Sequence, residues 1–384
     1  MELNNFYNKK IGILGGGQLG KMLCISAANM HLKTIVLDPS LNCSASLVCN
    51  QVHAGNYNDY ETVYRFGQLA DIITIEIENV NTEALIKLAE EGKTVHPNPL
   101  SLQIIQDKGL QKEFYVKNTL KSPPYILCEN KEKVKELITN GEISFPFVQK
   151  LRKAGYDGKG VAVINTPDDI HKLMDAPCVI EQKVKIKKEL SVIATRDIFG
   201  NVNCFTPVEM IFDEQANLVK YLFCPAQISD SIAESAITLA TKTIKAFDIV
   251  GILAVELFLN ENDELLINEV APRPHNSGHH TIESAFTSQY EQQLRAILGL
   301  SLGSTGMIMP SVMLNILGEP GYKGAVKYEG LEKCMEIEGA KIHLYGKTET
   351  SPYRKMGHIT ILDNSIENAK KKAEYIINHL KVIA

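Results

Sequence analysis

The 384-residue sequence predicts a mixed α/β and α+β protein with a parallel sheet at its N-terminus, an antiparallel sheet in its middle and a small C-terminal domain. Residues 10–100 alternate apolar strands with helical patterns in units of about thirty residues, which is typical of βαβ crossovers. After residue 100, strands and helices are mixed without that order, which favours an antiparallel sheet. From residue 301 onward, short strands precede a final helix.

The N-terminal domain is expected over residues 1–100 and ends at the turn-rich "HPNPLS" (96–101). Apolar patterning and turn signals predict a strand and turn at "KIGILGGGQLG" (10–20) and a helix at "KMLCISAANMH" (21–31). Two later strands are predicted at "KTIVLDP" (33–39) and "DIITIEIENV" (71–80).

The central domain is expected over residues 101–300 and the C-terminal domain over 301–384. In the central domain we expect a helix at 102–118, two strands joined by a glycine-rich loop at 145–164, two strands at 178–197, a helix at 233–248 and a hairpin at 251–271. In the C-terminal domain we expect strands at 311–317, 341–346 and 357–362 and a helix at 366–380.

The composition is that of a globular protein whose ligands are small molecules. Hydrophobic residues make up 45% and charged residues 22%, and a net charge of −5 supplies no overall basic field for nucleic acid. Eight cysteines are scattered without a C-x-x-C pair, and "MELNNFYNKK" does not have the pattern of a signal peptide. The longest apolar stretch, Ile249–Leu259, is shorter than the roughly 18 residues of a membrane span. We expect a cytoplasmic protein that binds neither nucleic acid nor membrane.

A glycine-rich turn follows the first predicted strand. Gly15, Gly17 and Gly20 form a G-x-G-x-x-G pattern between strand and helix, and Asp38 ends the next strand. Such a loop lets backbone N–H groups approach a phosphate, and the later acid suits a ribose hydroxyl. The pattern leaves three interpretations open: a dinucleotide site, contact with a phosphate-bearing substrate, or close packing of the strand on the helix.

A second glycine-rich segment, "GYDGKG" (155–160), lies between two predicted strands. Its backbone N–H groups and the Lys159 ammonium would suit a triphosphate, and Lys150 on the incoming strand would add a second cation. The spacing is not that of a Walker loop, and a plain hairpin turn is the alternative.

The predicted hairpin at 251–271 carries two carboxylates. If its turn centres on Asn262 and Asp263, a simple register pairs Glu256 directly with Glu269. Cross-strand partners have Cβ atoms about 4.5–5.5 Å apart, so these carboxylates would repel each other or share a proton unless a cation lay between them. Mg²⁺, or Mn²⁺ in its place, prefers such oxygen ligands, and Asn268 would supply a further one. A register slip of one residue would separate the pair.

The hairpin runs into a polar segment, "PRPHNSGHH" (272–280), that a hydrophobic core does not require. Arg273 suits an anion clamp because its planar fork fits a carboxylate or phosphate. His275, His279 and His280 offer a zinc alternative, but the two prolines and the glycine among them disfavour a continuous helix, and no cysteine lies nearby.

In this order the motifs resemble one known family. "GILGGGQLGKM", "EIENV", "GYDGKG", "VELF", "LLINEVAPRPHNSGH" and "YGKTETSPYRKMGHIT" are similar to the N5-carboxyaminoimidazole ribonucleotide synthetases, ATP-grasp ligases of purine biosynthesis, over nearly the whole chain. The resemblance implies a Rossmann-like pre-ATP-grasp domain, an ATP-grasp domain that binds ATP and Mg²⁺, and a C-terminal domain that completes the substrate site. It also implies a homodimer. The implied reaction converts ATP, bicarbonate and 5-aminoimidazole ribonucleotide to the N5-carboxylated ribonucleotide, ADP and phosphate through carboxyphosphate.

The resemblance also implies roles for individual residues. Mg²⁺ would be held by Glu256 and Glu269 with support from Asn268, and the catalytic residues around bicarbonate and the amine would be Arg273, His275 and Asn276. ATP would be bound by Lys108, Lys150, Gly155, Tyr156, Asp157, Gly158, Lys159, Gly160, Val161, Glu181, Gln182, Lys183, Val184, Glu189, Asn268 and Glu269. The aminoimidazole ribonucleotide would be bound by Gln18, Leu19, Glu76, Tyr156, Asp157, Lys347, Arg354 and Lys355.

Two positions depart from the family pattern: Val161 stands where glutamine is usual, and Gln182 where an acid is common. Within the same fold, the formate-dependent phosphoribosylglycinamide formyltransferases are the nearest alternative, but "PRPHNSGHH" is not expected in them. A nicotinamide-dependent dehydrogenase would explain Asp38 and the first glycine motif, but not the paired carboxylates. A non-catalytic nucleotide sensor would not need the full set of metal and anion groups.

Overall fold

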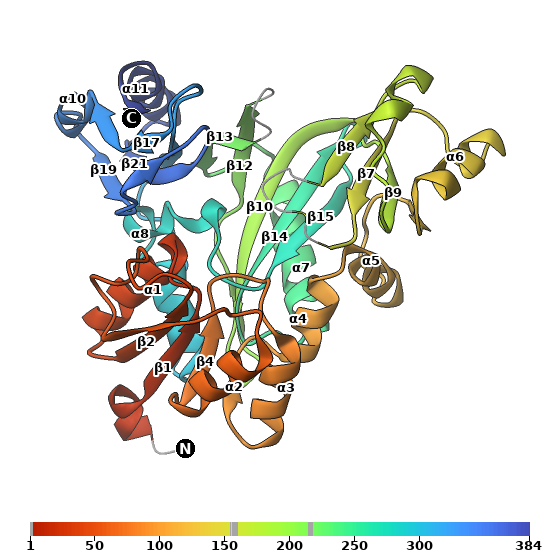
Figure 1. Ribbon diagram of the computed structural model, residues 1–384. Coiled ribbons are helices and arrows are strands. Elements are labelled where there is room, and N and C mark those ends of the chain that lie inside the picture. Colours follow the sequence, from red (N-terminus) through yellow and green to blue (C-terminus); the bar gives the residue numbers. More distant parts are fainter. Residues whose placement is uncertain (1–2, 154, 156–159, 214–217) are drawn as a thin grey trace.

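The computed structural model describes residues 3–153, 155, 160–213 and 218–384, and three sheets organise the chain (Figure 1). The first is a five-stranded parallel sheet of order β3-β2-β1-β4-β5, which confirms the predicted parallel N-terminal sheet. Its strands are β1 (Lys10–Leu14), β2 (Lys33–Asp38), β3 (Gln51–Ala54), β4 (Ile72–Ile75) and β5 (Thr94–Val95). The helical segments of this part are η1 (Leu3–Asn8), α1 (Gln18–Asn29), α2 (Tyr60–Gln68) and α3 (Thr82–Glu90).

The strand predicted at 71–80 is too long, because β4 ends at Ile75. Glu76 is the first residue beyond it, and its carboxylate accepts hydrogen bonds from the backbone N–H groups of Gly17 and Gly20. The chain therefore turns towards the β1–α1 loop instead of continuing as a strand.

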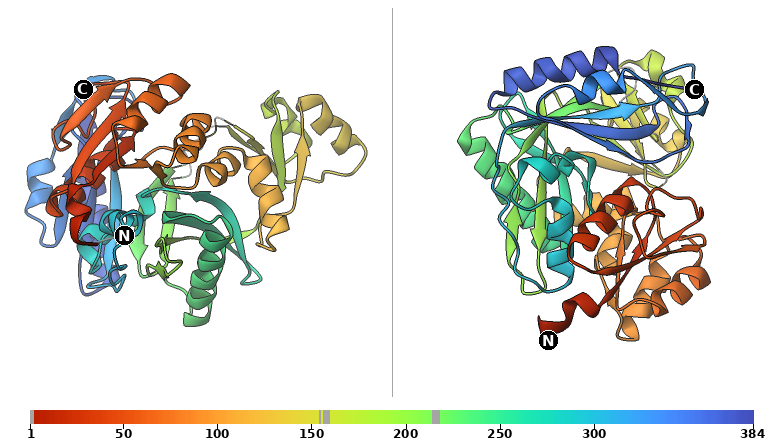
Figure 2. Two further views of the ribbon diagram at one scale, coloured as in Figure 1. Left: turned by 90° about the horizontal axis from the view of Figure 1, so that it is seen from below. Right: turned by 90° about the vertical axis from the view of Figure 1, so that its left-hand side faces the viewer.

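The second sheet has four antiparallel strands in the order β6-β9-β7-β8 and stands to one side of the molecule with α6 (Figures 1 and 2). Its strands are β6 (Tyr125–Cys128), β7 (Phe147–Leu151), β8 (Val161–Ile164) and β9 (Cys178–Gln182). The accompanying helical segments are α6 (Lys131–Thr139) and η2 (Pro167–Lys172). Strands β7 and β8 confirm the predicted pair on either side of the glycine-rich loop.

The helix predicted at 102–118 is two helices, α4 (Pro99–Ile105) and α5 (Lys108–Lys117). The break falls at Asp107, whose carboxylate accepts from the backbone N–H groups of Gly109 and Leu110 and pairs with Arg152. An aspartate in this position caps a new helix. A second helix therefore begins here although the apolar spacing continues through the break.

The third sheet is the largest, with nine strands in the order β15-β14-β10-β12-β13-β16-β21-β19 and β11 paired to β10. Its strands are β10 (Ile186–Arg196), β11 (Val202–Cys204), β12 (Val208–Asp213), β13 (Leu218–Cys224), β14 (Gly251–Asn260), β15 (Leu265–Ala271), β16 (Ser311–Leu317), β19 (Ala340–Leu344) and β21 (Lys355–Leu362). The adjacent pairs are antiparallel, as the sequence predicted for the central domain.

The remaining helices are α7 (Asp230–Ala246), η3 (Asn276–Gly278), α8 (Thr281–Ser284), α9 (Gln289–Ile297), α10 (Leu331–Met335) and α11 (Ile366–His379). The remaining strands are β17 (Gly324–Ala325), β18 (Lys327–Glu329), β20 (Glu349–Thr350) and β22 (Lys381–Ile383). Helix α7 covers the central sheet with an apolar face that includes Ala236, Ala240 and Ile244, and α11 covers the C-terminal strands.

Two packing arrangements cross the predicted domain boundaries. Strand β16 pairs with β13, so the C-terminal strands continue the central sheet. Helix α9 packs into the core of the N-terminal domain, where Leu294 and Ile297 join Ile11 and Leu23. The boundaries near residues 100 and 300 stay a prediction. Within the described residues, no helix is long and apolar enough to cross a membrane.

Candidate active site

The hairpin of β14 and β15 brings Glu256 and Glu269 together as direct cross-strand partners, which confirms the predicted pairing. The simple register is wrong near the turn, however, because Leu257 pairs with Ile267 and a bulge follows at Asn268. The bulge shifts the register by one residue and restores the Glu256–Glu269 pair beyond it. An extra residue in one strand changes the direction of the neighbouring side chains, so that Asn268 and Glu269 can both belong to one site.

Two lysines from other elements reach these oxygens. Lys108, the first residue of α5, places Nζ 2.8 Å from Glu269 Oε2, and Lys150 of β7 donates to Asn268 Oδ1 at 2.8 Å. The Lys150 contact joins the four-stranded sheet to the nine-stranded sheet. The predicted residues Lys108, Lys150, Asn268 and Glu269 therefore form one cluster.

A buried carboxylate holds the second lysine in place. Glu181 of β9 is 3% exposed, and its two oxygens lie 2.9 Å from Lys150 Nζ and 2.8 Å from Lys112 Nζ. Burial would raise the pKa of Glu181, but the two ammonium groups hold it below its usual range. Both oxygens of the Glu181 carboxylate therefore pair with lysines, one of which reaches the paired carboxylates through Asn268.

The pKa values of the two opposed carboxylates are shifted in opposite directions. Burial, together with the charges of Glu269 and Glu189, raises the pKa of Glu256, whereas Lys108 lowers the pKa of Glu269. Burial raises the pKa of Glu189 on β10 to about 7, against the opposing influence of Lys150. A further positive charge, in addition to the two lysines, would therefore stabilise the ionised form of Glu256.

The three predicted catalytic residues follow β15 and are each held by a different partner. Arg273 pairs with Glu78 Oε1 at 2.7 Å, and Asn276 donates through Nδ2 to Asn315 Oδ1 at 2.8 Å. His275 lies with Nε2 3.6 Å from Glu256 Oε1, so its imidazole faces the paired carboxylates.

The three histidines of this segment do not share one site. His275 is extended (φ −128°, ψ 156°), so no helix runs from it to His279. His279 Nδ1 lies 2.9 Å from the Tyr290 hydroxyl, and His280 Nδ1 lies 2.8 Å from Ser284 Oγ. Burial lowers the pKa of both His279 and His280, in the latter case to about 4. Within the described ranges, no group of three or more His, Cys, Asp or Glu side chains is arranged to hold a metal ion.

Acidic side chains accept hydrogen bonds from the backbone N–H groups of the first glycine-rich turn. Gly16 N–H donates to Asp38 Oδ2, and Gly17 and Gly20 donate to Glu76. A dinucleotide pyrophosphate would meet two carboxylates here instead of free N–H groups, which argues against the dehydrogenase interpretation. Burial raises the pKa of Glu76 to about 6, and the two N–H groups oppose that shift.

The predicted binding residues for the ribonucleotide come from three separate parts of the chain: residues 18–76, the glycine-rich loop and residues 347–355. Gln18 and Leu19 begin α1, and Lys21 of the same helix donates to the Leu344 carbonyl oxygen at 2.8 Å. Lys347 donates through Nζ to the carbonyl oxygen of Lys355 at 2.7 Å. The start of α1 therefore lies beside the end of β19, the strand that precedes Lys347.

Arg354 is exposed and donates to the carbonyl oxygen of Glu349. The described contacts thus place it against Glu349 and not against Gln18 or Glu76.

The remaining predicted ATP residues line the link between the two antiparallel sheets or the glycine-rich loop. Gln182 ends β9 and is exposed, and exposed Lys183 and half-buried Val184 lie in the segment that leads from β9 to β10. Val161 pairs with Lys150 at the base of the loop. Gly155 and Gly160 bring the loop ends together, since a Cβ on Gly160 would lie 3.2 Å from Gly155 Cα. Tyr156, Asp157, Gly158 and Lys159 lie outside the described residues.

Several residues of this site were missed by the sequence reasoning. Lys112 is four residues after Lys108 on one helix, and Ser191, the cross-strand partner of Glu256, is two residues after Glu189 on one strand, so periodicity alone could have found both. Asn315 bonds Asn276, and Gln289 accepts from the His275 N–H; both lie far from these partners in sequence, and no local signal points to them.

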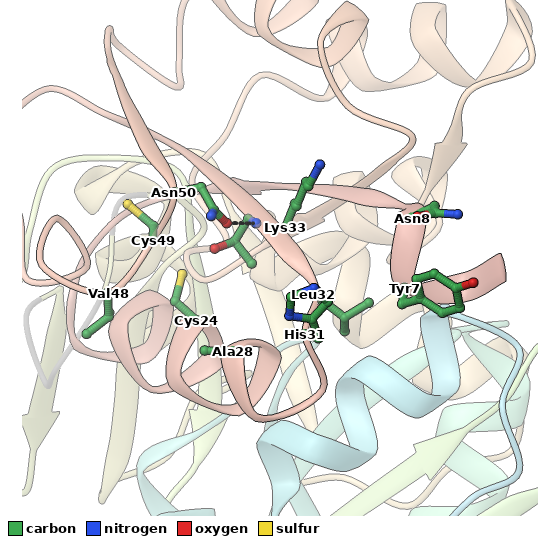
Figure 3. A pocket seen from close by; sticks show the side chains of 11 residues that line it. Tyr7, Asn8, Cys24, Ala28, His31, Leu32, Lys33, Val48, Cys49 and Asn50 are labelled. Atoms are coloured by element: carbon green, nitrogen blue, oxygen red, sulfur yellow. Dashed lines mark hydrogen bonds between the residues drawn. The ribbon is translucent and has the colours of Figure 1, made fainter.

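A separate hollow of about 440 Å³ lies in the N-terminal domain between the end of α1, the start of β2 and the segment before β3 (Figure 3). Its lining includes Cys24, His31, Lys33, Cys49 and Asn50. These residues lie at the amino ends of the parallel strands, away from the β1–α1 loop, and none of the predicted site residues lines it.

Family models match three parts of the chain. They are a ribonucleotide synthetase preATP-grasp domain at residues 8–106, an ATP-grasp domain at 113–290 and a phosphoribosylaminoimidazole carboxylase C-terminal domain at 311–372. Together with the sheets and the paired carboxylates, they define the chain as an ATP-grasp protein.

Two curated relatives differ in length. N5-carboxyaminoimidazole ribonucleotide synthase of Bacillus subtilis is 37% identical over 357 residues, covering 92% of this chain and 91% of the relative. Phosphoribosylaminoimidazole carboxylase of Candida albicans is 38% identical over 386 residues, covering 96% of this chain but only 66% of that longer protein. The chain belongs to the N5-carboxyaminoimidazole ribonucleotide synthase family.

Solved structures agree with this assignment. The N5-carboxyaminoimidazole ribonucleotide synthetase of Thermotoga maritima is 41% identical, with a TM-score of 0.90 over 98% of this chain and 99% of that one. The N5-carboxyaminoimidazole synthase of Aspergillus clavatus, in complex with ADP and 5-aminoimidazole ribonucleotide, is 32% identical, with a TM-score of 0.89 over 97% and 98% of the two chains.

Proposed function

We propose that this chain is an ATP-dependent carbon–nitrogen ligase that carboxylates 5-aminoimidazole ribonucleotide with bicarbonate in purine biosynthesis. The observation that carries the proposal is the Glu256–Glu269 pair with Lys108 and Lys150 at its edge. Phosphoryl transfer is catalysed mainly by positioning and charge neutralisation, and this cluster supplies both. Family membership supports the choice of substrates.

Magnesium fits the donor set of this cluster. Glu256, Glu269 and Asn268 offer hard oxygen atoms on one face of the hairpin, and burial disfavours two ionised carboxylates there without a further cation. Mg²⁺, or Mn²⁺ in its place, would neutralise the phosphate charge that develops during transfer. These three side chains would hold it.

The chain's own residues would divide the remaining work. Lys108 and Lys150 would bind the ATP phosphates, and the 183–185 link and Glu189 would face the adenosine. Arg273, His275 and Asn276, fixed by their separate partners, would surround bicarbonate and the amine. Glu76, Gln18, Leu19, Lys347, Arg354 and Lys355 would bind the ribonucleotide, the cations among them at its phosphate.

The first test is phosphate release from ATP and Mg²⁺ with each partner omitted in turn. Release that requires both bicarbonate and 5-aminoimidazole ribonucleotide supports the proposal. Release that requires formate and glycinamide ribonucleotide would instead identify the formyltransferase alternative. The absence of ATP turnover, with NAD rather than ATP raising the melting temperature, would refute the ligase assignment.

A homodimer and a cytoplasmic location are part of the proposal. Light scattering after gel filtration would measure the mass against the 42.6 kDa of one chain. Fractionation of cells of the source species would test the location, and enrichment in an organelle would refute it. The Vigna aconitifolia relative, which is described as chloroplastic, makes this a real alternative.

A further inference from the structure

The imidazole of His275 is held by a chain of two buried hydroxyl groups. Its Nδ1 atom lies 2.8 Å from Ser277 Oγ, and Ser277 Oγ lies 2.8 Å from Ser191 Oγ. Both serines are 1% exposed. Ser191 is the direct cross-strand partner of Glu256, so the far end of this chain lies beside a proposed metal ligand.

A backbone group decides which ring nitrogen of His275 carries the proton. The N–H of Ser277 donates to His275 Nδ1 at 3.3 Å. A backbone N–H can only donate, so Nδ1 must accept and cannot carry a proton itself. The neutral ring then has its proton on Nε2, which is the atom that faces Glu256 at 3.6 Å.

The same constraint gives the two hydroxyl groups a direction. With Nδ1 as acceptor, Ser277 donates its hydroxyl proton to His275, and its oxygen is then free to accept the proton of Ser191. The main chain of His275 is fixed as well: Gln289, which is fully buried, accepts from its N–H at 2.9 Å and donates to its carbonyl oxygen at 2.8 Å.

We infer that Ser191 and Ser277 are positioning residues that hold His275 as the Nε2–H tautomer, so that it presents a fixed hydrogen-bond donor to an anionic reactant. In this tautomer Nε2 has no lone pair in the ring plane, so His275 is neither a metal ligand nor a base at that atom. The catalytic meaning of the inference rests on the proposed function, but the tautomer itself does not.

The decisive measurement is long-range ¹H–¹⁵N NMR of the full chain with ¹⁵N-labelled histidine. The signals of His275 are assigned by their loss in His275→Gln among the ten histidines of the chain. An unprotonated Nδ1 with a protonated Nε2 supports the inference. A protonated Nδ1, protons on both nitrogens or averaged shifts would each overturn it, whether or not the chain has the proposed activity.

The functional consequence is tested by a double-mutant cycle. Ser277→Ala should lower kcat by about 10- to 100-fold, by analogy with the range for the hydrogen-bond partners of metal-ligating histidines, and leave the KM for ATP within about twofold. Ser191→Ala should cost less, and it should cost nothing further in the Ser277→Ala background. The matched control is Ser284→Ala, which removes an equally buried hydroxyl that bonds His280 and should leave kcat unchanged.

Additive losses for the two serines, or an equal loss in the control, would overturn the positioning role of Ser191 and Ser277. If Ser277→Ala does not fold, the NMR measurement on the wild-type chain still decides the tautomer. If the wild-type chain shows no turnover that depends on the ribonucleotide and bicarbonate, the proposed function fails, and the tautomer assignment is judged by the NMR signals alone.

Discussion

Replacing Glu181 by glutamine should destabilise the chain, and by an amount that depends on pH. The substitution keeps the shape of the side chain but removes the anion that lies between Lys112 and Lys150. Both ammonium groups are largely buried, with 3% and 11% of their side chains exposed. Removing one partner of a buried ion pair leaves the other charge uncompensated, which is the costly way to break such a pair.

The size of the effect follows from the ease with which Lys112 loses its proton. Burial and the neighbouring lysines lower the pKa of Lys112 to about 8, against the influence of Glu181. Proton release from such a group costs about 2.7 kcal/mol at pH 6 and nothing above about pH 8, since one pKa unit corresponds to about 1.4 kcal/mol. Lys150 loses one charged hydrogen bond, worth about 1.5 kcal/mol. The variant should therefore be less stable by about 4 kcal/mol at pH 6 and about 1.5 kcal/mol at pH 9.

The sign of this trend follows from proton binding. Below pH 8 the native wild-type chain keeps the Lys112 proton, whereas the native variant has lost it, so the advantage of the wild type shrinks as the pH rises through 8. For a domain of about 150–250 residues, such as the one expected over residues 101–300, 1 kcal/mol corresponds to about 2–4 °C in the melting temperature. We expect a deficit of roughly 8–16 °C at pH 6 and roughly 3–6 °C at pH 9.

The assay is a set of thermal melts at pH 6, 7.5 and 9, followed by circular dichroism, in buffers whose pH changes little with temperature. The matched control is Glu132→Gln, which removes the same charge from an exposed pair with Lys135 on α6. Its melting temperature should stay close to that of the wild type at every pH. A deficit for Glu181→Gln that is the same at pH 6 and pH 9, or no larger than that of the control, would refute the reasoning.

Three further outcomes are expected. Glu269→Gln should lower turnover at least about 10²-fold, because one oxygen anion leaves the metal site, whereas Glu264→Gln on the same hairpin should not; near-normal phosphate release would refute the metal role. Lys150→Met should raise the KM for ATP about 10-fold or more, because a phosphate-binding cation is lost, and an unchanged KM would exclude that role. His280 is buried and has its pKa lowered to about 4, so its protonation should contribute about 3 kcal/mol to the loss of stability of the wild-type chain as the pH falls from 6.5 to 4. In urea titrations the stability of His280→Gln should fall less steeply with acid than that of the wild type, and an equal fall would contradict this.

Periodicity and turn chemistry predicted most strands and helices because those signals are local. The strand before "GGGQLG", the helix after it, the strands on either side of "GYDGKG" and the long helix α7 lie where the patterns placed them. The break at Asp107 was missed because the apolar spacing runs through it, and only the carboxylate's bonds to Gly109 and Leu110 end one helix and begin the next.

The paired carboxylates were found by a register that was only partly right. The sequence placed the turn correctly to within a residue, and the bulge at Asn268 compensated for the remaining offset. No local pattern predicts such a bulge. The groups that fix the site's side chains, such as Gln289 on His275 and Asn315 on Asn276, are tertiary contacts, so single-sequence reasoning had no means of choosing them.

The continuity of the nine-stranded sheet has a consequence for how the residues of the site are positioned. Glu256 and Glu269 lie on β14 and β15, and Lys355 begins β21 of the same hydrogen-bonded sheet, so these groups belong to one rigid frame. Lys150 belongs to the four-stranded sheet, which continues into this frame through residues 183–185 and touches it at Asn268. Lys150 Nζ also lies 6.0 Å from the centroid of the Phe258 ring on β14, and Glu181 of β9 pairs with Lys112 of α5, so several side-chain contacts hold the smaller sheet in place. The relative placement of Glu256, Glu269 and Lys355 is therefore set within one sheet, whereas the placement of Lys150 depends on side-chain contacts between two sheets.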